Sequence, residues 1–150
     1  MSVRASQAFA ANRKAVISEL LNKLNLEFVP SYNAEIEDIR RQFEKMVTFA
    51  DEQPISAQAL KEAAESRRKA RILDINKRKN EFIQSLQVHM KMELAEKIKE
   101  YGGTEFEDEE SIEGAEEGKT RKVNKVKFPD GSMAKVPRNL FIDYQAFAKV

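Results

Sequence analysis

The chain has 150 residues, of which 34% are charged; 26 Lys and Arg face 25 Asp and Glu, for a formal net charge of +1. This charge content exceeds the roughly 25% of an ordinary globular domain and favours long, solvated helices over a thick core. The chain has no Cys, which excludes disulfides, thiolate chemistry and Cys-based zinc sites.

Hydropathy sets an expectation for the compartment. No apolar run approaches the roughly 18 residues that a membrane-spanning helix needs, and the first four residues lack the apolar core of a signal peptide. We therefore expect no membrane partner and an intracellular protein, either cytoplasmic or associated with the nucleus or nucleoid.

An apolar repeat with steps of three and four residues runs from Ile17 to Ala50 and predicts a first long helix over residues 12–50. The repeat slips between Phe28 and Ile36, and Pro30 falls inside this slip. Pro30 removes a backbone donor, so a kink or a break is expected there. Because the apolar stripe keeps its phase after Pro30, a bent continuous helix is favoured over two unrelated helices.

A second apolar repeat, from Leu60 to Tyr101, predicts a helix over residues 57–101 that starts after the N-cap residue Ser56 and stops at Gly102 and Gly103. The turn at 51–56 is short, so the two helices should be antiparallel neighbours. The expected fold is mainly α: residues 1–103 form a long antiparallel helical hairpin or coiled-coil bundle. Its narrow apolar stripes favour self-association into a homo-oligomer of at least two chains.

The remaining residues predict two smaller parts. Residues 104–118 hold eight acids and no base, and we expect an acidic flexible linker there. Residues 119–150 predict a small basic and aromatic docking element. It consists of a β-hairpin around a turn at 129–132 and a short terminal helix capped by Asn139.

Two basic runs are candidate nucleic-acid-binding sites, because cations spaced along an element can contact successive phosphates. The first run lies on the second helix and consists of Arg67, Arg68, Lys69, Arg71, Lys77, Arg78 and Lys79. In the alternative interpretation, pairing with Glu35, Glu37 and Asp38 across the hairpin neutralises much of this charge.

The second basic run precedes and enters the predicted hairpin and consists of Lys119, Arg121, Lys122, Lys125 and Lys127. The neighbouring acidic segment competes with any phosphate backbone for these cations, so a self-neutralising tail is the alternative. Few aromatic residues lie among these bases, which argues against stacking of single-stranded bases.

The order of a helical oligomerising part, a linker and a small basic hairpin resembles the layout of the histone-like nucleoid-structuring family. The resemblance is limited to this layout. Ser132-Met133-Ala134-Lys135 stands where that family has its Gln-Gly-Arg DNA-reading loop, and the linker is acidic where the family's is usually basic. No residue role is therefore carried over to this chain.

The C-terminal segment is the candidate partner-binding site. Leu140, Phe141, Tyr144 and Phe147 are spaced to share one face of the expected terminal helix. This face either caps the open end of the helical bundle or binds a groove of a partner protein.

No residue pattern predicts catalysis. The one histidine, His89, falls in the second helix and is expected at the surface, and there is no nucleophile–base pair or Gly-rich phosphate loop. We expect no enzyme, cofactor or metal. The sequence favours a non-enzymatic oligomerising adaptor or structural subunit of a larger assembly. The alternative is a nucleic-acid-binding accessory protein associated with a nucleoid, a chromosome or a phage.

Overall fold

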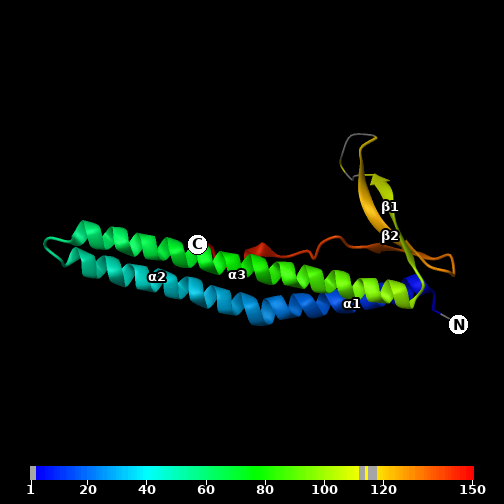
Figure 1. The fold of residues 1–150 in the computed structure, drawn as a ribbon, viewed down its shortest axis with the longest axis horizontal. Coiled ribbons are helices and arrows are strands. Elements are labelled where there is room, and N and C mark those ends of the chain that lie inside the picture. Colours follow the sequence, from blue (N-terminus) through cyan, green and yellow to red (C-terminus); the bar gives the residue numbers. More distant parts are fainter. Residues whose placement is uncertain (1–2, 112–113, 115–117) are drawn as a thin grey trace. The chain divides into compact units, whose positions relative to one another are not determined.

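The computed structural model describes residues 3–111, 114 and 118–150. The fold is mainly helical, as predicted: 66% of the described residues lie in helices, and a three-stranded antiparallel sheet follows the long helices. In chain order the elements are α1 (Ala5–Lys23), the π-helix η1 (Leu24–Phe28), α2 (Val29–Asp51), α3 (Ala57–Glu100), β1 (Thr104–Ser111), β2 (Thr120–Lys127), β3 (Met133–Val136) and the 3₁₀-helix η2 (Tyr144–Ala146) (Figure 1).

Pro30 does not interrupt the first helical stretch, because α1, η1 and α2 follow one another without a gap over 47 residues. Pro30 lies in the first turn of α2 and has no N–H to donate. Just before it, the Val29 N–H bonds back five residues to the Leu24 carbonyl, as in a π-helix. A π turn accommodates one extra residue. This explains why the apolar repeat slips to steps of four at this place and still keeps its phase.

Contacts divide the chain into two compact units. Unit 1 comprises Met1–Leu21 and Leu86–Phe141, and unit 2 comprises Asn22–Ser85 and Ile142–Val150. Each unit combines segments that are distant in the sequence, so neither one coincides with a single segment expected from the sequence.

The core of unit 1 joins α1, the second part of α3 and the sheet. Phe9 and Met90 are fully buried, and the Phe128 ring lies 5.7 Å from the Phe9 ring and 6.3 Å from the Tyr101 ring. Other buried apolar side chains of this unit are Leu20, Leu86, Leu94, Ile98, Val126 and Leu140. Packing of α3 against the sheet continues up to the predicted helix stop. There the Gly103 N–H bonds to the Ile98 carbonyl and Gly102 takes a left-handed conformation.

Helix α1 begins at Ala5, seven residues before the predicted start. The turn between β2 and β3 caps it: the Asp130 carboxylate accepts a hydrogen bond from the Ala5 N–H at 2.8 Å, and the Ser132 hydroxyl accepts one from the Ser6 N–H at 3.1 Å. These N–H groups have no partner within their own helix. A cap supplied from 125 residues further along the chain leaves no local sequence signal.

The prediction of a flexible linker is wrong for residues 104–111, which form strand β1. This strand pairs antiparallel with β2, and β2 pairs antiparallel with β3, so the strand order is β1-β2-β3. The register places Glu109 opposite Lys122 and Glu110 opposite Arg121. Opposite charges across the ladder offset the self-repulsion on which the linker prediction relied. The rest of the predicted linker, apart from Gly114 and Gly118, lies outside the described residues. The predicted hairpin around 129–132 is confirmed as β2 and β3.

Unit 2 buries apolar side chains of η1, α2, the first part of α3 and the C-terminal segment. They are Leu24, Val29, Tyr32, Ile36, Ile39, Ala50, Ala64, Ile75, Ile83, Ile142 and Phe147. The predicted terminal helix with Asn139 as its cap is wrong. Only Tyr144–Ala146 form a turn of 3₁₀-helix, and its cap is Asp143, whose carboxylate accepts a hydrogen bond from the Gln145 N–H.

Candidate functional site

Three of the seven cations of the basic run on α3, Arg68, Arg71 and Arg78, make close ion pairs with acids of unit 2. The Arg78 guanidinium lies 2.6 Å from the Glu35 carboxylate, and Arg71 lies 3.3 Å from Asp38. The hydrogen bond from Arg78 holds the pKa of Glu35 below its usual value. Two of the three acids expected to neutralise this run therefore do so. The third, Glu37, pairs with Arg40 on its own helix instead.

Two further cations of this run lie over aromatic rings. The Arg68 guanidinium sits 4.9 Å from the centre of the Phe43 ring and also pairs with Glu65. The Lys79 ammonium lies 5.3 Å from the Tyr32 ring centre and 5.2 Å from that of Phe147. Among the described residues, Arg67 and Lys77 make no ion pair, and Lys69 makes only a 4.0 Å contact with Glu65. Arg67, Lys69 and Lys77 of this run remain exposed to solvent.

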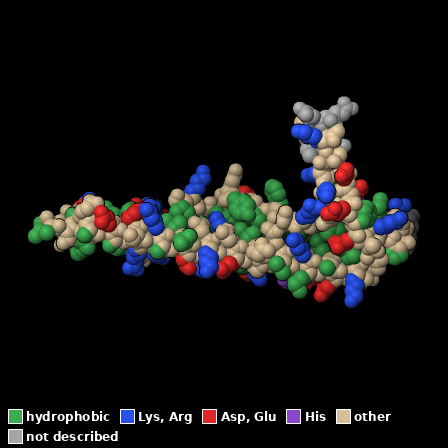
Figure 2. Space-filling view, turned by 45° about the horizontal axis from the view of Figure 1, so that its top comes forward, with side chains coloured by type: hydrophobic (Ala, Val, Ile, Leu, Met, Phe, Trp, Pro, Cys, Tyr) green, Lys and Arg blue, Asp and Glu red, His purple; other side chains and the backbone are tan. Residues whose placement is uncertain are grey.

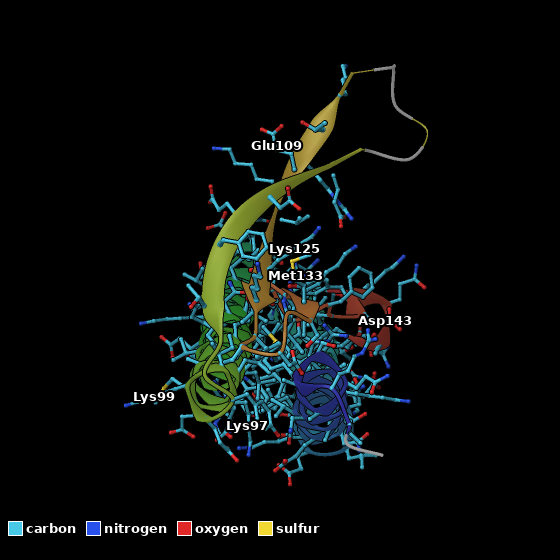
Figure 3. The ribbon with its side chains drawn as sticks, turned by 90° about the vertical axis from the view of Figure 1, so that its right-hand side faces the viewer. Lys97, Lys99, Glu109, Lys125, Met133 and Asp143 are labelled. Atoms are coloured by element: carbon cyan, nitrogen blue, oxygen red, sulfur yellow. The ribbon has the colours of Figure 1, made fainter. Side chains whose placement is uncertain are left out.

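Apart from Lys119, the second basic run lies on β2, and Figure 2 shows Lys and Arg side chains together with Asp and Glu side chains on the β1–β2 ribbon. Its residues fall on two faces because side chains alternate along a strand. Arg121, Lys125 and Lys127 share one face with Lys135 and Met133 of β3, and Figure 3 shows Lys125 and Met133 on neighbouring strands. Lys122 is on the opposite face. No ion pair of Lys119, Lys122 or Lys127 occurs within the described part of the chain.

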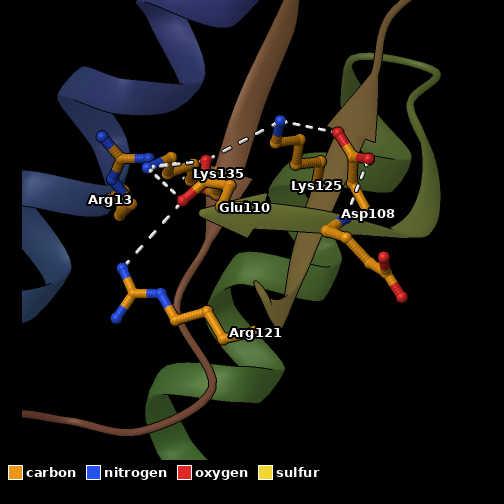
Figure 4. A network of polar contacts seen from close by, with 7 residues as sticks. Arg13, Asp108, Glu110, Arg121, Lys125 and Lys135 are labelled. Atoms are coloured by element: carbon orange, nitrogen blue, oxygen red, sulfur yellow. Dashed lines mark hydrogen bonds and ion pairs between the residues drawn. The ribbon is translucent and has the colours of Figure 1, made fainter. Parts of the chain in front are cut away.

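Glu110 is the centre of an ion-pair network on this sheet (Figure 4). Its carboxylate lies 2.9 Å from the Lys135 ammonium, 3.8 Å from Lys125 and 4.0 Å from Arg121. Lys125 also bonds to Asp108 at 2.8 Å, and only 20% of its side chain is exposed. The hydrogen bond from Lys135 lowers the pKa of Glu110, and the one from Lys125 lowers the pKa of Asp108. Lys125 is thus a structural cation.

An open groove of about 520 Å³ in unit 1 brings together cations that are far apart in the sequence. Its charged lining comprises Arg13 of α1, Arg121 and Lys122 of β2, Lys135 of β3, and Arg138 beyond β3. Arg121 and Lys122 belong to the predicted basic run, whereas Arg13, Lys135 and Arg138 were not predicted as site residues. The hairpin register places Lys135 directly opposite Lys125, so the predicted hairpin could have revealed it. No sequence signal connects Arg13 to this place.

The C-terminal aromatic residues do not share one face. Leu140 is 4% exposed in unit 1 and Phe147 is 6% exposed in unit 2, whereas Phe141 is 90% and Tyr144 is 58% exposed. The Phe147 ring stands perpendicular to the Tyr32 ring at 5.1 Å and edge-on to the Phe28 ring at 6.3 Å. Of the four residues predicted to bind a partner, two are therefore used within the chain.

Asn33 holds the backbone on both sides of Phe147. Its side-chain amide donates a hydrogen bond to the Ala146 carbonyl at 3.1 Å, and its oxygen accepts one from the Ala148 N–H at 2.7 Å. A terminal helix would use these backbone groups internally, so this bidentate contact explains why the segment is extended. The sequence gives no sign of this role of Asn33.

Other functional groups are scarce in the part of the chain that is described. His89 is exposed on α3, 3.6 Å from Glu93, at the surface as expected. Within the described residues there is no cluster of three or more acidic or histidine side chains suited to a metal ion. None of the described helices has the length and apolar character needed to cross a membrane. Comparison with known proteins finds no family model, no curated protein and no solved structure that matches this chain.

Proposed function

We propose that this protein is a non-enzymatic structural subunit that self-associates through an antiparallel helical hairpin formed by α2 and the first part of α3. Ion pairs between the two helices support the hairpin, because the residue number of the partner on α3 falls as the residue number on α2 rises. Three ion pairs follow this order: Glu35–Arg78, Asp38–Arg71 and Asp51–Lys61. Such pairs fix the alignment of two helices more than they stabilise it.

The observation that carries this proposal is an apolar groove in unit 2 that one chain leaves open. Its lining consists of the apolar side chains Ile36, Ile39, Phe43, Ile72 and Val150 and of three cations, Arg40, Arg68 and Lys149. Phe43 and Ile72 are only half-buried, as are Met46 and Leu60 further along the same stripes. A second copy of the hairpin offers a matching apolar stripe, and burying both stripes removes apolar area from water at about 25 cal/mol per Å².

Sedimentation equilibrium tests self-association. We expect a mass of at least twice the chain's 17.2 kDa at micromolar concentration. The double variant Phe43→Ser/Ile72→Ser should sediment as a monomer while its circular dichroism stays helical. The matched control Leu73→Ser, at a position that is 74% exposed, should keep the wild-type mass. A wild-type monomer at high micromolar concentration would refute the proposal.

Docking of another protein belongs to the same proposal and would use the C-terminal residues that the chain leaves exposed. Phe141 and Tyr144 are large side chains in contact with water, which is the property of an interface anchor. Affinity capture from the host with the wild-type chain and with Phe141→Ala/Tyr144→Ala tests this role. A partner retained equally well by both chains would remove it.

The second candidate function is a nucleic-acid-binding accessory protein. The observation that favours it is a set of three exposed cations, Lys119 just before β2 and Lys122 and Lys127 on β2, which make no ion pair with another described residue. The pairing of Arg68, Arg71 and Arg78 argues against the helical run as the binding surface. Binding of a generic DNA duplex at low salt, falling steeply as salt rises, would support this function.

A further inference from the structure

The open groove of about 520 Å³ in unit 1, called the cationic groove below, has an excess of positive charge that the rest of the sheet lacks. Five cations line it, and no acid is part of its lining. Two carboxylates contact these cations from outside the lining: Glu110 contacts Lys135 and Arg121, and Glu107 lies 3.4 Å from Arg138. Five positive charges against two negative charges leave a local excess of three.

Part of this lining is held in place by the fold. The Arg13 guanidinium donates a hydrogen bond to the Lys135 carbonyl at 2.6 Å, which ties α1 to β3. Arg138 donates one to the Asn124 side chain at 3.2 Å. Arg121, Lys122 and Lys135 are exposed at the rim, with 65% of the Arg121 and 61% of the Lys135 side chain in contact with water. Anchored and solvent-exposed cations side by side suit a ligand that carries several negative charges along its length.

We propose that this groove binds the phosphodiester backbone of nucleic acid without reading its sequence. The inference rests on the second candidate function and names its surface. The cations are contributed by α1, β2, β3 and Arg138 beyond β3, so they come from four separate segments of the chain. The uncharged lining consists of aliphatic, Pro and Asn side chains, with no aromatic ring on which a base could stack. Contacts are therefore made with phosphates.

The test compares two variants that each remove three positive charges. The groove variant is Arg121→Gln/Lys122→Gln/Arg138→Gln. The control is Arg67→Gln/Lys69→Gln/Lys77→Gln, which neutralises exposed cations of the basic run on α3. Fluorescence anisotropy with a labelled 20-base-pair duplex and with the corresponding single strand, at several salt concentrations, gives the affinity and its salt dependence.

We expect the groove variant to bind at least about tenfold more weakly at low salt, with a log–log salt slope shallower by about 2–3 for three lost phosphate contacts. The control should stay within about threefold of the wild type. If both variants lost affinity equally, or only the control lost affinity, the groove would not be the binding surface, although the protein would still bind nucleic acid. No wild-type binding to either oligonucleotide would overturn both, as would binding to anionic lipid vesicles alone. Sedimentation of the same variants reports self-association separately.

Discussion

At the scale of single residues, Phe147 and Asn33 together show how the C-terminal segment is fixed. Phe147 supplies apolar contact with two rings, and Asn33 satisfies the backbone polar groups on either side of it. Burial of an aromatic ring is favourable only when nearby polar groups keep their hydrogen bonds. The pair therefore acts as a unit.

The buried Phe147 and the exposed Phe141 should contribute differently to the free energy of unfolding. Phe147→Ala should lower the free energy of unfolding by about 3 kcal/mol, the lower end of the range for a buried Phe, because the site lies near a chain end that can relax. Phe141→Ala should change it by less than about 0.5 kcal/mol, since that ring is 90% exposed. Urea denaturation followed by circular dichroism measures both. Equal effects would mean that Phe147 is not an anchor.

Gly103 is required for close approach between the end of α3 and the sheet. A Cβ atom at this position would lie 2.5 Å from Val126 Cγ2 and 2.9 Å from the Phe128 ring, both of which are buried. Gly103→Ala should therefore destabilise the chain by about 2–3 kcal/mol through overpacking.

Gly131 provides the matched comparison for Gly103. It has a φ of +85°, and a Cβ atom there meets nothing within 4 Å. Gly131→Ala should cost only the strain of a left-handed backbone, about 1 kcal/mol. Thermal unfolding measures the loss of stability in both variants. A larger loss for Gly131→Ala than for Gly103→Ala would contradict the packing argument.

At the scale of elements, the carboxylates of strand β1 make the stability of the folded chain depend on pH. Glu110 and Asp108 have pKa values held below their ordinary 4.5 and 3.8 by hydrogen bonds from Lys135 and Lys125. A carboxylate with a depressed pKa in the folded state stabilises that state at pH values above its unfolded pKa. The contribution is lost as pH falls through the folded pKa.

We therefore expect the melting temperature to be nearly constant from pH 7 to 5 and to fall below about pH 4. Glu110→Gln should lower the melting temperature at pH 7 and flatten the decline at acid pH. Glu19→Gln, which removes a carboxylate that makes no ion pair among the described residues, should follow the wild-type curve. Differential scanning calorimetry across this range gives the comparison. If the melting temperature of Glu110→Gln fell below about pH 4 as steeply as that of the wild type, the Glu110 ion pairs would not be the cause of the acid sensitivity.

The elements also show what local sequence can reveal. The long helices, their stop at Gly102 and Gly103, and the β2–β3 hairpin follow from apolar period and turn residues, so they were predictable. Strand β1 was missed because its acids were considered without the cations that β2 places opposite them. The extended C-terminal segment depends on Asn33, 113 to 115 residues away, and the groove depends on Arg13. Contacts of this kind carry no local signal.

At the scale of the whole molecule, both units draw on α3, unit 2 through residues 57–85 and unit 1 through residues 86–100. The two proposed activities fall on different units, with self-association on unit 2 and phosphate binding on unit 1. A subunit organised in this way would present one binding groove per chain, and association of chains would raise the number of grooves available to one nucleic acid. Linked sites bind a long ligand more tightly than single ones.

Self-association should make the melting temperature depend on protein concentration. When folding is linked to assembly, the melting temperature rises with protein concentration, because mass action favours the assembled state. We expect an increase of roughly 2 °C for each tenfold rise in wild-type concentration. Phe43→Ser/Ile72→Ser should melt at a lower temperature that does not depend on concentration, because its groove no longer holds a second copy. A wild-type melting temperature that is flat over a hundredfold concentration range would show that the open apolar groove of unit 2 is not filled by another chain.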